Sequence, residues 1–280
     1  MIEGLRAKGF GRIVVELGSH SAGSAAGIID LATDLARALN IEITALFVEE
    51  EQLFDLVGLP IGAAVHPGAR EGVARPDHVL IQETLARQAR LCHLALARKA
   101  RESDLRWSFE SRRGDPLNLV QAIAGPGDLI ILSGTIASVT MRSGVEAAQQ
   151  ALAKAAAVII AFPHRPQPRG TIVVIDQHGL AAGLEELAAG LASSLREELS
   201  VFPLHIRTAA KASGGAPGGE ANLVAAKAAL RLLKPRLLIS SLVGSATDED
   251  LRRLSSLVRA AQSPLLLVRN HDNSSTGSHT

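Results

Sequence analysis

One short segment, Gly127 to Gly134 with the sequence GDLIILSG, constrains the fold of this chain more than any other. Four apolar residues follow one another without a polar alternation, and glycines stand at both ends. Such a run predicts a strand buried on both faces, as in parallel sheets covered by helices. A helical stripe follows, at Val145, Ala148, Leu152 and Ala155. Strand, glycine loop and helix is the arrangement in which α/β proteins bind phosphate on free backbone N–H groups.

Length and composition exclude several classes of protein. The 280 residues suffice for two ordinary domains. The 29 Lys and Arg against 28 Asp and Glu give a net charge of +1, which offers no general attraction to nucleic acid or an anionic membrane. A single cysteine, Cys92, rules out an internal disulfide and a cysteine-based zinc site. With no signal peptide and no apolar run of membrane-spanning length, we expect a cytoplasmic protein.

The first half alternates strand and helix patterns. We predict strands at 12–17, 41–48, 106–110, 128–132 and 157–162, and helices at 28–39, 77–102, from Asp115-Pro116 onward and from Val145 onward. The three prolines in 163–170 predict a stiff linker. The pattern then restarts, with strands at 171–176, 201–206, 237–241 and 264–268 and helices at 180–199, 222–233 and 248–261. The second half is therefore a shorter repeat of the first.

Several of these pieces resemble the universal stress protein family. They are Ile13-Val14-Val15 with Gly18-Ser19, Leu31-Ala32 with Leu35 to Leu39, Ile43 to Val48, Asp128 to Ile131, and Ser263-Pro264 with Leu265 to Arg269. The last is the most specific, because the family typically ends its domain in a small residue, Pro, an apolar run and Arg. The resemblance covers about Arg12 to Asn270.

The resemblance implies an α/β fold of two tandem universal-stress-protein-like domains, each an open parallel sheet of the five-stranded type with helices on both faces. We place the first domain at 1–163, the linker at 164–170, the shortened second domain at 171–269 and a disordered tail at 270–280. The domains would pair about a pseudo-two-fold axis through their last strands. A homodimer of the whole chain stays open.

Nucleotide-binding members of the family carry three spaced glycines followed by Ser or Thr after strand four. Here Gly134 and Gly144 keep the second and third glycines. The first glycine is replaced by Ile131, or by Ser133 if the loop is shorter. The position of the Ser or Thr is taken by Val145. The acidic residue after strand one would fall at Leu17, or at Glu16 with a slip of one. The resemblance gives these candidate nucleotide-binding residues: Gly18, Ser19, Val48, Ser133, Gly134, Ser143, Gly144 and, in the second half, Asp176.

Other candidate chemistry is weaker. Ser19-His20 lacks a third triad member, and the histidines show no metal spacing, so we predict neither a catalytic residue nor a metal site. Arg112, Arg113 and Arg142 would meet phosphate only if they converge, and we expect a solvated surface. The apolar connection Gln52–Arg75 could be a lid, a partner surface or a segment packed on its own domain.

We therefore expect a regulatory protein of the universal stress type, not an enzyme, that acts through an unknown protein partner with weakened or absent adenine-nucleotide binding. No cofactor is certain. The alternative is a stress sensor that binds ATP or AMP, with Mg²⁺, at a divergent site in the first half, with or without slow ATP hydrolysis. A third class is another small ligand between the sheet and Gln52–Arg75.

Overall fold

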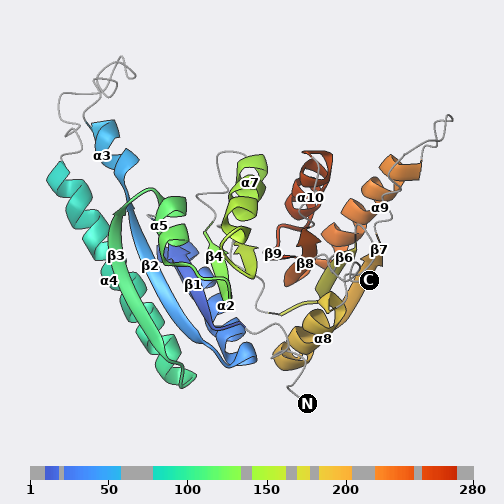
Figure 1. The fold of residues 1–280 in the computed structure, drawn as a ribbon, viewed down its shortest axis with the longest axis horizontal. Helices are drawn as coiled ribbons and strands as arrows, with labels where there is room; N and C mark the ends of the chain where they lie inside the picture. The colour runs from blue at the N-terminus through green and yellow to red at the C-terminus, as the bar shows by residue number, and fades with distance from the viewer. Residues whose placement is uncertain are drawn as a thin grey trace, which may run out of the picture.

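The computed structural model describes residues 10–18, 22–57, 78–133, 141–161, 169–176, 183–203, 218–242 and 248–269. These ranges form an α/β structure in which nine strands make one sheet and eight helices cover it (Figure 1). The strands are β1 (Arg12–Leu17), β2 (Glu42–Glu50), β3 (Trp107–Gly114), β4 (Asp128–Leu132), β5 (Ala157–Ile160), β6 (Ile172–Asp176), β7 (Leu199–Pro203), β8 (Leu237–Leu242) and β9 (Leu265–Arg269). The helices are α2 (Ala22–Leu39), α3 (Glu51–Val57), α4 (His78–Glu102), α5 (Pro116–Ile123), α7 (Met141–Leu152), α8 (Leu184–Leu195), α9 (Gly218–Leu233) and α10 (Asp248–Ala261).

The strand order across the sheet is β3-β2-β1-β4-β5-β9-β8-β6-β7. Neighbouring strands pair in parallel everywhere except at β5 and β9. There the two pair antiparallel over four residues, from Ala157 opposite Val268 to Ile160 opposite Leu265. The fold is thus two parallel stretches of sheet joined by one antiparallel contact.

Helices cover both faces, and each face has its own core. Buried side chains of α2, α4 and α8 pack against the strand residues that face one side of the sheet, such as Val15 and Val174. Those of α5, α7, α9 and α10 pack against the strand residues that face the other side, such as Val14 and Val173. Figure 1 shows the two rows of helices on opposite sides of the sheet. Alternation of side chains along each strand explains why consecutive residues serve different cores.

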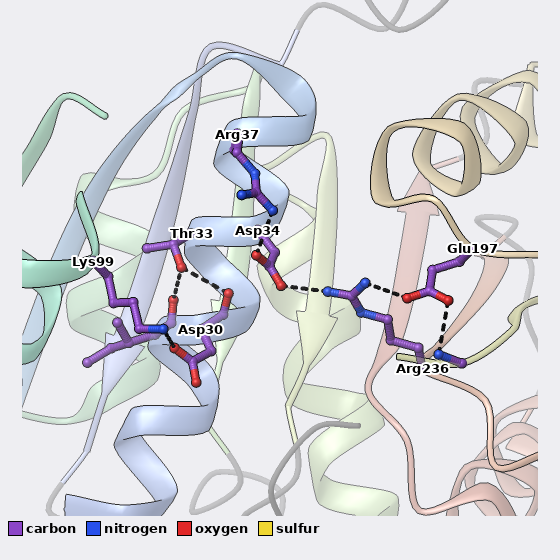
Figure 2. A network of polar contacts seen from close by, with 9 residues as sticks. Asp30, Thr33, Asp34, Arg37, Lys99, Glu197 and Arg236 are labelled. Carbon is purple, nitrogen blue, oxygen red and sulfur yellow. Dashed lines mark hydrogen bonds and ion pairs between the residues drawn. The ribbon is translucent and has the colours of Figure 1, made fainter. Parts of the chain in front are cut away.

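The two stretches of sheet are also tied by a charged network between helix α2 and the region before β8 (Figure 2). Arg236, whose side chain is only 8% exposed, donates to Asp34 Oδ2 at 2.5 Å and to Glu197 Oε1 at 2.8 Å. The Gly170 N–H donates to the other oxygen of Glu197 at 3.1 Å. One guanidinium therefore joins a carboxylate from the first half to one from the second, with one terminal nitrogen donating to each.

A second tie crosses the junction on the side of α7. The Arg269 side chain at the end of β9 donates to the carbonyl of Leu152, the last residue of α7, and its backbone N–H donates to Ala156 O at 3.2 Å. A cation at a helix C-terminus satisfies an orphan carbonyl and suits the helix dipole. Arg269, the last residue of the most specific motif in the sequence, therefore has a visible structural role.

The sequence predicts most of these elements correctly. The predicted bounds of β1 and α10 are those observed, and Asp115 caps α5 by accepting from the Asn118 N–H at 2.9 Å. Cys92 is buried. The predicted α/β class with helices on both faces is confirmed. The domain boundaries stay a prediction, and residues 164–168 of the linker and the tail from 270 lie outside the described residues.

Three predictions of local structure need correction. Residues 51–57, expected as part of a loop, form α3, and the described side chains Leu53 and Phe54 pack on the core. Helix α7 begins at Met141, so it includes Gly144 instead of following it. Strand β3 runs on to Gly114, beyond the predicted end at 110. Its charged end stays paired because Arg113 meets Glu49 of β2 at 3.2 Å.

We predict that Arg236→Ala lowers the free energy of unfolding by about 3 kcal/mol, because it leaves two carboxylates without their shared partner. Urea denaturation followed by circular dichroism measures the change. Arg37→Ala is the matched control: it removes an ion pair to the same Asp34 at 3.1 Å, but its side chain is 61% exposed. The control should cost less than about 1 kcal/mol. Equal, small effects of the two substitutions would contradict the role given to Arg236.

Candidate functional site

The candidate site lies where strand order reverses, between β1 and β4. From β1 the chain passes through α2 to β2 on one side, while β4 leads through α7 to β5 on the other side and on the opposite face. Open α/β sheets form a crevice at the carboxyl ends of strands at such a point, and ligands commonly bind there. The residues at these strand ends are therefore the first to examine for function.

Glu16, on β1, is the chemically distinctive residue of this place. It is fully buried, and it lies on the same face as Val14, toward α5 and α7, where Leu46, Val48 and Leu132 are also buried. Its Oε2 accepts two hydrogen bonds from Ser133, one from the backbone N–H at 2.8 Å and one from the hydroxyl. Ser133 follows β4 directly, so these bonds join the ends of the two strands at the switch point.

The surroundings of Glu16 raise the pKa of its carboxyl toward neutral pH. Burial raises the pKa of its carboxyl from 4.5 to about 7, the two bonds from Ser133 oppose this rise, and the negative charge of Glu50 adds to it. Its second oxygen, Oε1, is buried and accepts no hydrogen bond within the part of the chain that the structure describes. A buried carboxyl with one satisfied and one orphaned oxygen is costly, and such groups gather at functional sites.

The structure brings together only part of the predicted site. Gly18 is buried just after β1, Val48 is buried on β2, and Ser133 follows β4, so all three belong to the same edge of the sheet. Ser19 and Gly134 lie outside the described residues.

The remaining predicted residues lie elsewhere or in a helix. Ser143 and Gly144 are in the first turn of α7. Asp176 ends β6 and is buried, but β4, β5, β9 and β8 separate β6 from β1. It does not join the group around Ser133, and it belongs to the corresponding reversal between β6 and β8.

Sequence reasoning left Glu16 out of the candidate site, naming it only as a slipped position. Leu17, the other candidate for the acidic position, packs in the core on the face of α2. The signal was present in the sequence, because Glu16 is the one charged residue inside the apolar run 13–17. A charged residue buried in a central strand is expected only where it has a partner.

The arginines do not converge on the site. Arg112 pairs with Glu110 at 2.6 Å, and Arg113 pairs with Glu49 and stacks over the Phe54 ring at 4.0 Å. Both lie on the edge strand β3, two strands away from β1. This confirms the surface interpretation for these two residues. The Arg142 side chain lies outside the described residues.

The described residues fit a bound nucleotide phosphate poorly. The Ser133 N–H, the first donor after β4, already donates to Glu16, and an ionised carboxylate there would repel a phosphate group. Among the described residues, no group of three or more His, Cys, Asp or Glu side chains is placed to hold a metal ion. Over the same ranges, none of the helices has both the length and the apolar character needed to cross a bilayer.

Comparison with known proteins supports the fold alone. No protein-family model matches the chain, and no curated protein does. Among solved structures, it is similar to a functionally unknown protein, PA1789, from Pseudomonas aeruginosa PAO1. The TM-score is 0.54 with 14% sequence identity, and the match covers 95% of each chain. The similarity thus extends over the whole two-part sheet, at an identity too low to carry function.

We predict a pH-dependent stability that comes from Glu16. Below about pH 4.5 its carboxyl is protonated in both folded and unfolded chains, and between 4.5 and about 7 only the folded chain keeps the proton. The free energy of unfolding therefore falls as pH rises through this window, by roughly 3 kcal/mol for this group, and is level above it.

Glu16→Gln removes this titration, so the variant should gain stability relative to the wild type as pH rises from 4.5 to 7. Urea denaturation at a series of pH values measures the difference. A difference that does not change with pH would contradict a raised pKa at Glu16.

Proposed function

We propose that this chain is a tandem universal-stress-type regulatory protein that acts through protein partners, with adenine-nucleotide binding weakened or absent. It is not an enzyme in this proposal. The single observation that carries the nucleotide part is the bond between Glu16 and the Ser133 N–H. This donor would begin a phosphate cradle after β4, and a carboxylate from the chain itself already holds it.

The arrangement of strands supports the tandem interpretation. Read from each edge toward the junction, strands β2, β1, β4 and β5 of the first half correspond to β7, β6, β8 and β9 of the second. Strand β3 has no counterpart among the described residues of the second half. Corresponding helices meet across the junction, since α2 contacts α8 and α7 contacts α10. This is what a pseudo-two-fold axis through the β5–β9 pair would produce.

An exposed apolar stripe on α4 supports a protein partner. Leu80, Leu91 and Leu94 are between 44% and 55% exposed, and their spacing places them on one side of the helix. Val79 beside them is 57% exposed. Single exposed apolar residues are ordinary, but several on one helix face mark a surface that another protein can cover.

A second candidate function keeps a divergent nucleotide site in the first half. It is favoured by the position of Gly18 and Val48, which lie with Ser133 at the switch point where ligands of α/β sheets bind. In this candidate, protonation of Glu16 lowers the repulsion, and ATP or AMP binds with Mg²⁺.

Calorimetric titration with ATP, ADP and AMP, with and without Mg²⁺, distinguishes the two candidate functions. The proposal predicts no heat and no thermal shift at millimolar nucleotide and pH 8, where Glu16 is ionised. One-to-one micromolar binding that Gly144→Val abolishes, with the fold intact, would overturn it in favour of the second candidate. Binding that survives Gly144→Val would place the ligand elsewhere and would equally contradict the proposal.

The partner surface has its own test. We expect Leu91→Asp combined with Leu94→Asp to remove specific proteins that the wild type retains in quantitative affinity purification. The control is Val224→Asp, which alters a 66% exposed apolar residue on α9 and should retain them. If the wild type, the double variant and the control all retain the same set of proteins, the α4 stripe is not the partner surface.

A further inference from the structure

Positively charged side chains line a groove between α9 and α10 on the outer side of the second half. A hollow of about 360 Å³ lies there, lined by Lys227, Arg231, Arg252, Ser255, Ser256, Arg259 and Ala260. The two helices lie next to each other on the same face of the sheet, over β8 and β6 (Figure 1). The hollow lies beside the middle and C-terminal turns of both helices, away from the strand ends of the candidate site.

Helical spacing explains why these residues face one groove. On α9, Lys227 and Arg231 are four residues apart, and on α10, Arg252, Ser255, Ser256 and Arg259 recur at three and four. The neighbouring side of each helix is in the core, through Ala226 and Leu230 on α9 and through Leu251, Leu254 and Val258 on α10. Each helix thus has an apolar side on the sheet and a basic side toward its neighbour.

The lining holds four cationic side chains and no acidic one, and one of the four, Arg252, already has an interaction partner. Lys227, Arg231 and Arg259 have no acidic partner within the described ranges, although Arg253, one position outside the lining, pairs with Glu249 at 2.6 Å. Like charges four residues apart on a helix are mutually destabilising. In a chain of net charge +1, this concentration of positive charge is local, and a bound anion would offset the repulsion among its members.

The hydrogen bonds of the two serines determine which donors in the groove are available to an anion. The Ser255 hydroxyl donates to Leu251 O at 2.7 Å, and the Ser256 hydroxyl donates to Arg253 O at 2.7 Å. Their protons are therefore used by the helix itself, and the donors available to a ligand are guanidinium and ammonium groups. Guanidinium groups bind phosphate oxygens in pairs, and several together favour a ligand with several phosphates.

We propose that this groove binds a compact small molecule that carries two or more phosphate groups. The volume lies at the lower end of the range for small-ligand sites, about 300–1,000 Å³, which favours a short polyphosphate over a macromolecule. The site is independent of the function proposed above, because it uses neither the switch point nor the α4 stripe. It requires no adenine pocket, so the phosphates alone should bind.

The test is calorimetry with inorganic tripolyphosphate on the full chain, at constant ionic strength, beside sulfate and a short poly-glutamate peptide. We expect one site per chain for tripolyphosphate and weak or no binding of the other two. Arg231→Gln with Arg259→Gln should weaken binding by about tenfold for each lost charged contact. The control Arg253→Gln, on the same helix but outside the groove, should bind as the wild type does.

Both variants change exposed or half-buried side chains, so folding is checked by thermal unfolding, and the double variant should be no less stable without ligand. Failure of tripolyphosphate to bind, equal loss in the control, or tighter binding of poly-glutamate than of tripolyphosphate would each overturn the proposal. None of these outcomes depends on whether ATP binds at Ser133. A further variant, Glu16→Gln, should leave tripolyphosphate affinity unchanged.

Discussion

The antiparallel pairing of β5 with β9 is the contact on which the rest of the structure depends. Without it, two stretches of parallel sheet would each expose a buried apolar strand and a row of unpaired backbone groups. Four residue pairs close these edges, and helices from both halves then cover the joined sheet on each face. Arg236 and Arg269 reinforce the contact on the two sides, each by binding groups of the other half.

The junction uses β5 and β9, so the two points where strand order reverses take no part in it. The reversal between β1 and β4 holds Glu16, whose carboxyl is removed from water and only half satisfied. Burial outweighs the two bonds from Ser133, because desolvation is the largest cause of the raised pKa. The result is a group near its midpoint at neutral pH, in the position where nucleotide-binding α/β proteins place phosphate-binding backbone. This arrangement is the structural basis of the weakened or absent nucleotide binding that we propose.

The fold could be predicted from sequence to the extent that each element carries its own periodicity. The apolar run of β4 and the stripes of α2 and α10 are local signals, and they predicted the type of all three elements and the bounds of β4 and α10. Short or charged elements were harder. Helix α3 has seven residues and no cap signal, and the end of β3 extends the parallel backbone pairing with β2, where Glu49 also meets Arg113 across the pair.

The site was harder still, because it depends on contacts across long separations. Glu16 and Ser133 are 117 residues apart, and nothing in either local sequence shows that they bond. The basic groove combines residues from two helices whose individual stripes look like ordinary solvated faces. The predicted residues Gly18 and Ser133 lie at the same end of the sheet, but the sequence could not show that a carboxylate accepts from the Ser133 N–H.

The most direct test of this account is the titration of Glu16 itself. Carbon NMR of a chain labelled at the glutamate carboxyl, assigned by comparison with Glu16→Gln, gives the midpoint of this group with and without ATP. The account predicts a midpoint near pH 7 that ATP does not move. A midpoint near 4.5 would contradict burial as the dominant influence on the Glu16 carboxyl, and a midpoint that ATP shifts would contradict the claim that Glu16 holds the Ser133 N–H and keeps nucleotide out.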